Sequence, residues 1–215
     1  MKKNKTKKAI ILSALFLGPL IFYIFLSLGI YHHANLPILT DKVEDVKGNA
    51  SFKNHFSVVS FLGSDIENNK AGLFNLNEVI YKRYRKSLHF QSVLIAPKGT
   101  ESEVETLKKK LSTYRDINNW RFVFMNTDEI KSLFNSFDSP YTINQDLSSE
   151  YTFIIDRELR LRGRKDDEDT DNGRLYGYNM TSVNDLKNKM KKDLEIIYYQ
   201  LKKSMEKEKR FKRKI

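Results

Sequence analysis

Short runs of apolar residues alternate along this chain with longer segments in which apolar residues recur every three or four positions. The short runs are rich in β-branched and aromatic side chains and predict strands at residues 56–62, 90–96, 120–125 and 151–155. Helical spacing predicts helices within residues 73–86, 100–114 and 127–137. A last helix is predicted to start at Ser182, with one apolar face made of Leu186, Met190, Leu194, Ile197 and Leu201.

The fourth predicted strand is followed by a charged turn and a second short run, Leu159 to Arg162, which together predict a hairpin. Strands joined through helices must be parallel with right-handed connections, whereas the hairpin adds an antiparallel edge. The resulting order, β-α-β-α-β-α-β-β-α, is the thioredoxin arrangement, in which helices cover both faces of a central mixed sheet. We therefore expect a thioredoxin-like α/β fold.

An uncharged apolar segment precedes this globular part. Residues 9–30 are 22 positions without a charge, and as a helix they would be about 33 Å long, which matches the apolar core of a bilayer. A cleaved signal peptide has a shorter apolar region and a small-residue cleavage site. A buried helix of a soluble protein would need a larger core than this chain can build. Residues 9–31 are therefore predicted to form one N-terminal transmembrane helix, a signal anchor in the lipid bilayer.

Charge is concentrated at the two ends of the chain. The formal net charge is +11, and the five lysines among the first eight residues together with the basic tail after residue 201 account for all of it. Positive charge beside an apolar span is held on the cytoplasmic side. We therefore expect a single-pass protein of the cytoplasmic (inner) membrane, with its N-terminus inside and its domain facing the periplasm or exterior. The neutral middle gives no support for a nucleic-acid partner.

These features divide the chain into a basic cytoplasmic N-terminus (1–8), the anchor (9–31), a linker (32–51), the thioredoxin-like domain (52–201) and a basic tail (202–215). The tail has two interpretations. Its basic residues could attract anionic lipid at roughly 1 kcal/mol per residue close to the surface, or it is a solvated, fraying helix end.

The chain contains no cysteine. A disulfide, a thiolate nucleophile, an iron–sulfur cluster and a Cys-ligated zinc or copper site are therefore excluded. His32 and His33 start the linker, and His55 and His89 precede strands, so no histidine is expected at the carboxyl end of the sheet, where ligands converge. We expect neither a metal nor a cofactor.

An acidic segment, residues 166–173, has the composition of a calcium loop. Counted from Asp167, however, the glycine stands at position 7, and Tyr178 stands at position 12, where an EF-hand needs a bidentate glutamate. A solvated loop is the interpretation that we prefer. No G-x-S-x-G elbow and no phosphate-binding glycine loop occur, so the sequence does not support a hydrolase or a nucleotide-binding protein.

Three pieces of sequence resemble one known family. The first strand runs into Phe61-Leu62-Gly63-Ser64, the fourth ends as Phe153-Ile154-Ile155-Asp156, and a Leu-Arg strand follows, Leu159-Arg160-Leu161-Arg162. With the apolar anchor, this pattern resembles the SCO/SenC proteins over roughly residues 52–200. The resemblance implies a copper chaperone or thiol reductant that helps to assemble cytochrome oxidase at the outer face of the membrane.

The family's chemistry resides in a Cys-x-x-x-Cys loop after the first strand and in a histidine before the late strand, which together hold Cu(I) or cycle through a disulfide. Carried over to this sequence, the cysteine positions fall on or near Ile66 and Lys70, and the histidine position falls near Ser148. All three ligands are missing. The copper and redox functions are therefore expected to be absent.

Two groups of residues are candidates for binding a partner. The first is the former active-site loop, which stays polar after the loss of its cysteines, and it comprises Ser64, Asp65, Glu67, Asn68 and Asn69 with Ser148 and Arg162. The second is a basic-aromatic connection before the last helix, which includes Arg162, Arg164, Tyr176 and Tyr178. Such a connection grips an anionic group or an acidic partner, or its cations form internal ion pairs with the acidic segment.

The function that we expect from the sequence is that of a membrane-tethered, non-catalytic binding or assembly factor, with an envelope or respiratory-complex protein as its partner. The alternative is a thioredoxin-like oxidoreductase or peroxidase-type enzyme that relies on a partner's thiols or on a bound cofactor.

Overall fold

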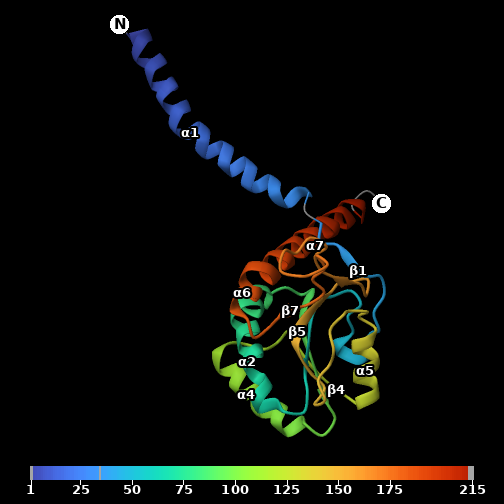
Figure 1. Ribbon diagram of the computed structural model, residues 1–215. Helices are drawn as coiled ribbons and strands as arrows, with labels where there is room; N and C mark the ends of the chain where they lie inside the picture. Colours follow the sequence, from blue (N-terminus) through green and yellow to red (C-terminus); the bar gives the residue numbers. More distant parts are fainter. Residues whose placement is uncertain (1, 34, 213–215) are drawn as a thin grey trace. The chain divides into compact units, whose positions relative to one another are not determined.

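The computed structural model describes residues 2–33 and 35–212 (Figure 1). The chain forms two compact units, which are considered one at a time: residues 36–201, and the terminal segments 1–35 and 202–215. Residue 1 of the predicted N-terminus, residue 34 of the predicted linker and residues 213–215 of the predicted tail lie outside the described residues.

The N-terminal segment is one long helix, α1 (Lys2–His33), with Pro19 inside it. It contains the whole of the predicted anchor, residues 9–31. Large apolar side chains along it are exposed, among them Leu15 by 68%, Phe16 by 73% and Tyr23 by 70%. Among the described residues, no helix is found that combines the length and the apolar character needed to cross a membrane. The membrane-spanning role of this segment stays a prediction.

Residues 36–201 are built on a seven-stranded mixed sheet. Its strands are β1 (Ile38–Thr40), β2 (Phe56–Leu62), β3 (Phe90–Pro97), β4 (Trp120–Met125), β5 (Ser148–Ile155), β6 (Leu161–Arg162) and β7 (Tyr178–Asn179). Their order is β1-β6-β5-β2-β3-β4, and β7 pairs with β5. Strand β2 is parallel to β3, β3 is parallel to β4, and β5 is antiparallel to both β2 and β6. This topology confirms the predicted thioredoxin-like α/β fold.

Helices cover both faces of the sheet (Figure 1). They are α2 (Ile66–Leu76), α3 (Lys82–Tyr84), α4 (Glu101–Tyr114), α5 (Thr127–Asn135), α6 (Val183–Asp185) and α7 (Lys191–Lys212). Two π-helical segments, η2 (Asn77–Tyr81) and η3 (Leu186–Met190), connect α2 to α3 and α6 to α7, and a short 3-10 turn, η1 (Gly48–Ala50), precedes β2. The five apolar positions predicted for the last helix are all buried, which confirms that face.

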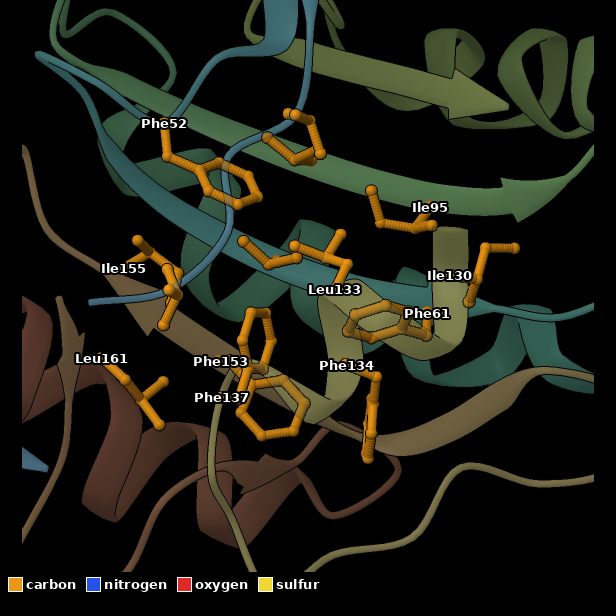
Figure 2. Packing of buried hydrophobic residues seen from close by; sticks show 14 of the residues in the cluster. Phe52, Phe61, Ile95, Ile130, Leu133, Phe134, Phe137, Phe153, Ile155 and Leu161 are labelled. Atoms are coloured by element: carbon orange, nitrogen blue, oxygen red, sulfur yellow. The ribbon is translucent and has the colours of Figure 1, made fainter. Parts of the chain in front are cut away.

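The apolar core on one face of the sheet lies under α5 (Figure 2). The ring centroid of Phe61 on β2 is 5.1 Å from that of Phe134 and 5.8 Å from that of Phe137, and Phe153 on β5 is 4.9 Å from Phe137. These rings meet edge to face, the favoured arrangement for aromatic pairs. On the other face, Phe56 packs against Tyr84 and Tyr198. Both cores fix the direction of β2, whose carboxyl end carries the candidate site.

The predicted linker, residues 32–51, is in large part built into the domain. Strand β1 pairs antiparallel with β6, and Val43 and Val46 are buried in the core. The amide of Val43 donates a hydrogen bond of 2.8 Å to the carbonyl oxygen of Leu159. The linker prediction is wrong here because a three-residue strand has no periodicity and forms only through long-range contacts. Strand β1 also occupies the sheet edge that was expected for the hairpin.

Candidate functional site

The chain leaves the carboxyl end of β2 through Gly63, which has a positive φ of 74°. A Cβ atom at this position would lie 2.7 Å from the carbonyl oxygen of Asp146 and 2.7 Å from the Cβ of Ser148. Both the backbone angle and the space therefore require glycine. The turn is pressed directly against the segment that leads into β5.

Asp146 holds the two segments together. Its carboxylate accepts hydrogen bonds from the hydroxyl of Ser148 at 2.6 Å, from the amide of Ser148 at 3.1 Å and from the side-chain amide of Asn69 at 2.8 Å. Its carbonyl oxygen accepts from the amide of Ser64 at 2.8 Å. Burial acts to raise the pKa of Asp146, but the hydrogen bonds from Ser148 and Asn69 outweigh it, so the pKa lies below its usual value. Sequence reasoning missed this residue.

These hydrogen bonds occupy the side chains of two predicted site residues, Ser148 and Asn69. Ser148 is buried, and its hydroxyl also accepts from the side-chain amide of Asn144 at 3.0 Å. Asn69 donates to the carbonyl oxygen of Leu62 at 2.9 Å as well as to Asp146. The side chains of Ser148 and Asn69 are thus committed to internal contacts, and they support the surface of the site.

The segment predicted as a polar loop, residues 64–70, contains the start of α2. Asp65 is the N-cap residue, and its carboxylate accepts from the amide of Asn68 at 3.3 Å and from its side-chain amide at 2.7 Å. Ile66 is buried in the first turn. The loop prediction is wrong from Ile66 onward because the apolar spacing of α2 begins only further along the chain, at Leu73.

Residues at this start of α2 line a pocket of about 260 Å³. On the α2 side it is lined by Ser64, Asp65, Ile66, Glu67 and Lys70, and on the α4 side by Glu103, Thr106, Leu107 and Lys110. Glu67 pairs with Lys70, and its other oxygen lies 3.6 Å from the Nζ of Lys110. The pocket therefore presents both signs of charge over a small apolar floor. We call these residues the α2 rim.

Arg162 lies elsewhere in the molecule. It pairs with Ile154 in the sheet, whereas Ser148 pairs with Leu62, so the two residues lie at opposite ends of β5. Its guanidinium is buried and donates to the carboxylate of Asp156 at 2.9 Å and to the carbonyl oxygen of Leu36. The structure does not bring Arg162 to the α2 rim, because β5 runs to the amino end of β2 and Arg162 follows directly after the hairpin turn at that end.

Most of the predicted basic-aromatic connection forms an internal network. Two guanidinium nitrogens of Arg164 donate to Asp193 of α7 at 2.7 and 3.0 Å, and the hydroxyl of Tyr178 donates to the same carboxylate at 2.7 Å. Burial raises the pKa of Tyr178 well above its usual value, and burial also raises the pKa of Asp193 despite the two donors. Asp193 was missed, although an acidic residue next to the apolar face of a helix is a signal for an internal partner.

The acidic segment joins this network. Asp167 is buried, and its carboxylate lies 3.4 Å from Arg164 and 2.7 Å from the Nζ of Lys189. The solvated-loop prediction is wrong for Asp167. Tyr176 is also buried, within the apolar core. Of the two interpretations of the basic-aromatic connection, internal ion pairs are therefore the one that the structure supports for Arg164.

The described residues contain no group of three or more His, Cys, Asp or Glu side chains that could hold a metal ion. His55 and His89 lie directly before β2 and β3, at the amino ends of these strands, as predicted. What the α2 rim offers is hydrogen-bonding groups and charges of both signs at the surface of a rigid turn, without sulfur.

No protein-family model and no curated protein matches the chain. Among solved structures, it is similar to BsSco, a member of the Sco family of cytochrome c oxidase assembly proteins, at 12% identity over 72% of this chain and 96% of that chain, with a TM-score of 0.46. It is similar to copper-bound ScoI of Arabidopsis thaliana at 16% identity over 67% and 86%, with a TM-score of 0.42. It is also similar to the thioredoxin domain of a thiol-disulfide oxidoreductase of Bacteroides vulgatus at 18% identity over 72% and 91%, with a TM-score of 0.40.

Proposed function

We propose that this protein is a non-catalytic binding and assembly factor, tethered to the cytoplasmic membrane, whose partner docks on the α2 rim. One observation carries the proposal: Asp146 fixes the turn at the carboxyl end of β2 through Ser64, Asn69 and Ser148, while the polar residues Ser64, Asp65 and Glu67 of the rim stay exposed. A fixed turn keeps the binding groups in one arrangement, which lowers the entropy cost of docking.

The same residues argue against the chemistry implied by the SCO/SenC resemblance. At the positions that match the family's ligands, Ile66 is buried, Lys70 pairs with Glu67, and Ser148 is hydrogen bonded to Asp146. Thiolates are the ligands that favour Cu(I), and the chain has none. The resemblance instead suggests the class of partner, a subunit or maturation factor of a respiratory oxidase or another envelope complex.

The tether is part of the proposal. Residues 9–30 carry no charge, and the apolar side chains described on α1 are exposed along it, for example Ile11 by 67% and Phe22 by 64%. Such a helix is stable in lipid, where its apolar side chains need no protein partner. The lysines before it favour a cytoplasmic N-terminus, so the domain would face the periplasm or exterior.

The proposal is tested by purifying the full-length chain from detergent-solubilised membranes and identifying its partners by mass spectrometry. We expect an oxidase subunit or maturation factor to co-purify with the wild type and to be lost with Glu67→Arg, which reverses a charge on the α2 rim. Glu168→Arg makes the same change at an exposed position away from the rim and should retain the partner. Equal recovery with both variants, or no such partner with the wild type, would contradict the proposal.

A turnover assay separates this function from the enzymatic alternative. The purified chain is incubated with disulfide or peroxide substrates, with and without the membrane extract that could supply a partner's thiols. We expect no turnover above that of buffer or of extract alone. Turnover that appears only when the chain is added would favour the oxidoreductase.

A further inference from the structure

The two edge strands of the sheet, β1 and β4, differ in length and regularity. The proposed function involves neither of them. The edge formed by β1 is three residues long, and its pairing with β6 has a register shift. The edge formed by β4 is six residues long and pairs with β3 in unbroken register from Trp120 to Met125. Short or irregular edges resist pairing with other chains, whereas long regular edges invite it.

The outer side of β4 has no strand partner in the described part of the chain, although the carbonyl oxygen of Trp120 on that side accepts a hydrogen bond of 3.1 Å from the guanidinium of Arg121. The amide of Ser92 donates to the carbonyl oxygen of Asn119, and the amide of Lys98 donates to that of Met125. Alternate residues of a strand face the same neighbour, so the backbone groups of Phe122 and Phe124 point away from β3. Within the described part of the chain, no strand pairs with β4 on that side.

The side chains along this edge are apolar and half-exposed. The strand reads WRFVFM, with Arg121 as its one charged residue and no proline. Phe122 and Phe124 lie on one face and Val123 lies on the other, and a groove of about 410 Å³ is lined by Val123, Phe124 and Met125 at the carboxyl half of the strand. Charges, prolines and bulges are the usual protection of edge strands. Within β4 only Arg121 is of this kind, and Lys108 of α4 lies over the ring of Phe122, with its Nζ 4.8 Å from the ring centroid.

We infer that β4 pairs antiparallel with β4 of a second copy of this chain, about a two-fold axis at Val123. In this register Phe122 of each copy lies opposite Phe124 of the other, and each such pair exchanges both backbone hydrogen bonds. The inference does not depend on the partner at the α2 rim, which is formed by other elements.

Charge favours a second copy in this orientation. The groove at the carboxyl half of β4 is lined by Glu44, Asp45 and Glu129, with Lys47 and Lys98 as its cations, so carboxylates are in excess. Arg121 lies at the amino end of the strand, where its guanidinium donates to the carbonyl oxygens of Asn118 and Trp120 and keeps its positive charge. An antiparallel pair places Arg121 of each copy opposite Met125 of the other, beside these carboxylates. A parallel pair would instead bring like ends together.

The absence of cysteine makes a direct test possible. At the two-fold axis the Val123 residues form a non-hydrogen-bonded pair, with Cα atoms about 4.5 Å apart, which is within the range of a disulfide. Oxidation of full-length Val123→Cys in dilute detergent micelles should therefore shift the chain from the mass of one copy to that of two on a non-reducing gel. Met125→Cys is the matched control, because its counterpart would lie about 14 Å away at ~3.4 Å per residue.

Two further variants make the register falsifiable. A mixture of Arg121→Cys and Met125→Cys chains should form a mixed dimer, since these positions face each other. Adding Phe124→Pro to Val123→Cys removes an outward N–H but leaves the bonds to β3 intact, so the cross-link should be lost. A Met125→Cys dimer as abundant as the Val123→Cys dimer, or no Val123→Cys dimer at all, would overturn the inference.

Discussion

The α2 rim and the Asp193 network look alike in the sequence and differ in the structure. Both are rich in charged and polar residues next to predicted elements. At the rim, Asp65 and Glu67 are exposed, whereas Asp193 is buried and receives donors from both Arg164 and Tyr178. Charged residues in a connection therefore indicate a binding surface only where they remain exposed to solvent. The buried network joins the last helix to the sheet.

The largest loss in the free energy of unfolding is expected from Asp193→Ala. It leaves the buried hydroxyl of Tyr178 without its acceptor and removes two hydrogen bonds of the half-buried guanidinium of Arg164. Removal of one partner of a buried ion pair costs about 3–5 kcal/mol. Urea unfolding of the full-length chain measures the loss. Asp171→Ala, at an exposed position of the acidic segment, is the control and should change the free energy of unfolding by less than ~0.5 kcal/mol. Similar losses in the two variants would show that burial does not distinguish these carboxylates.

Gly63→Ala tests the turn that supports the rim. The new Cβ would meet Asp146 and Ser148 at 2.7 Å, and φ is positive, so we expect a loss of about 2–4 kcal/mol. Gly48→Ala is a matched control, because Gly48 has a similar φ of 79° but nothing within 4 Å of the added Cβ. It should lose only about 1 kcal/mol, from the backbone angle alone. Equal losses would mean that the contact with Asp146 contributes nothing.

The contributions of Asp146 and Asp193 to the free energy of unfolding should change in opposite directions as the pH falls. The folded-state pKa of Asp146 is lowered, so its stabilisation is present above the unfolded-state value and is lost as the pH falls through the folded value. The folded-state pKa of Asp193 is raised, so the native state gains stability as the pH falls through that value. Urea unfolding between about pH 6 and pH 3 should show the deficit of Asp146→Asn shrinking and that of Asp193→Asn growing. Parallel trends would contradict the two assignments.

The smallest changes in stability are expected from substitutions in the α2 rim. Asp65→Ala removes the N-cap of α2 and should cost about 1 kcal/mol. Glu67→Ala removes only exposed ion pairs and should stay within ~0.5 kcal/mol of the wild type. Thermal unfolding followed by circular dichroism checks both. A loss at Glu67 as large as that at Asp65 would mean that the rim is a structural element, and its use as a binding surface would lose support.

The sequence predicted strands β2, β3, β4 and β5 well, because each contains a short run rich in β-branched and aromatic residues. The bounds of β2 and β4 match the predicted runs, and the order of elements was sufficient for the fold. Strands β1 and β7 were missed, since two or three residues carry no pattern and pair only with distant parts of the chain.

The candidate site was predicted less completely. The polar residues from Ser64 to Asn68 were identified, but the helix that starts at Ile66 and the role of Asp146 were not. Asp146 lies in a polar loop, and its importance comes from Asn69, which is 77 positions away in the chain. Arg162 and Tyr178 were proposed as surface residues because sequence shows charge and ring type but does not show burial.

The central claim is that the α2 rim contacts a membrane-complex partner, and site-specific photo-cross-linking in intact membranes tests it most directly. A photoreactive amino acid replaces Ser64 in one chain and Glu168 in another, and the adducts are identified by mass spectrometry. The account predicts an adduct with an oxidase subunit or maturation factor from position 64 and none from position 168. The absence of an adduct at position 64, or the same adduct from both positions, would contradict it.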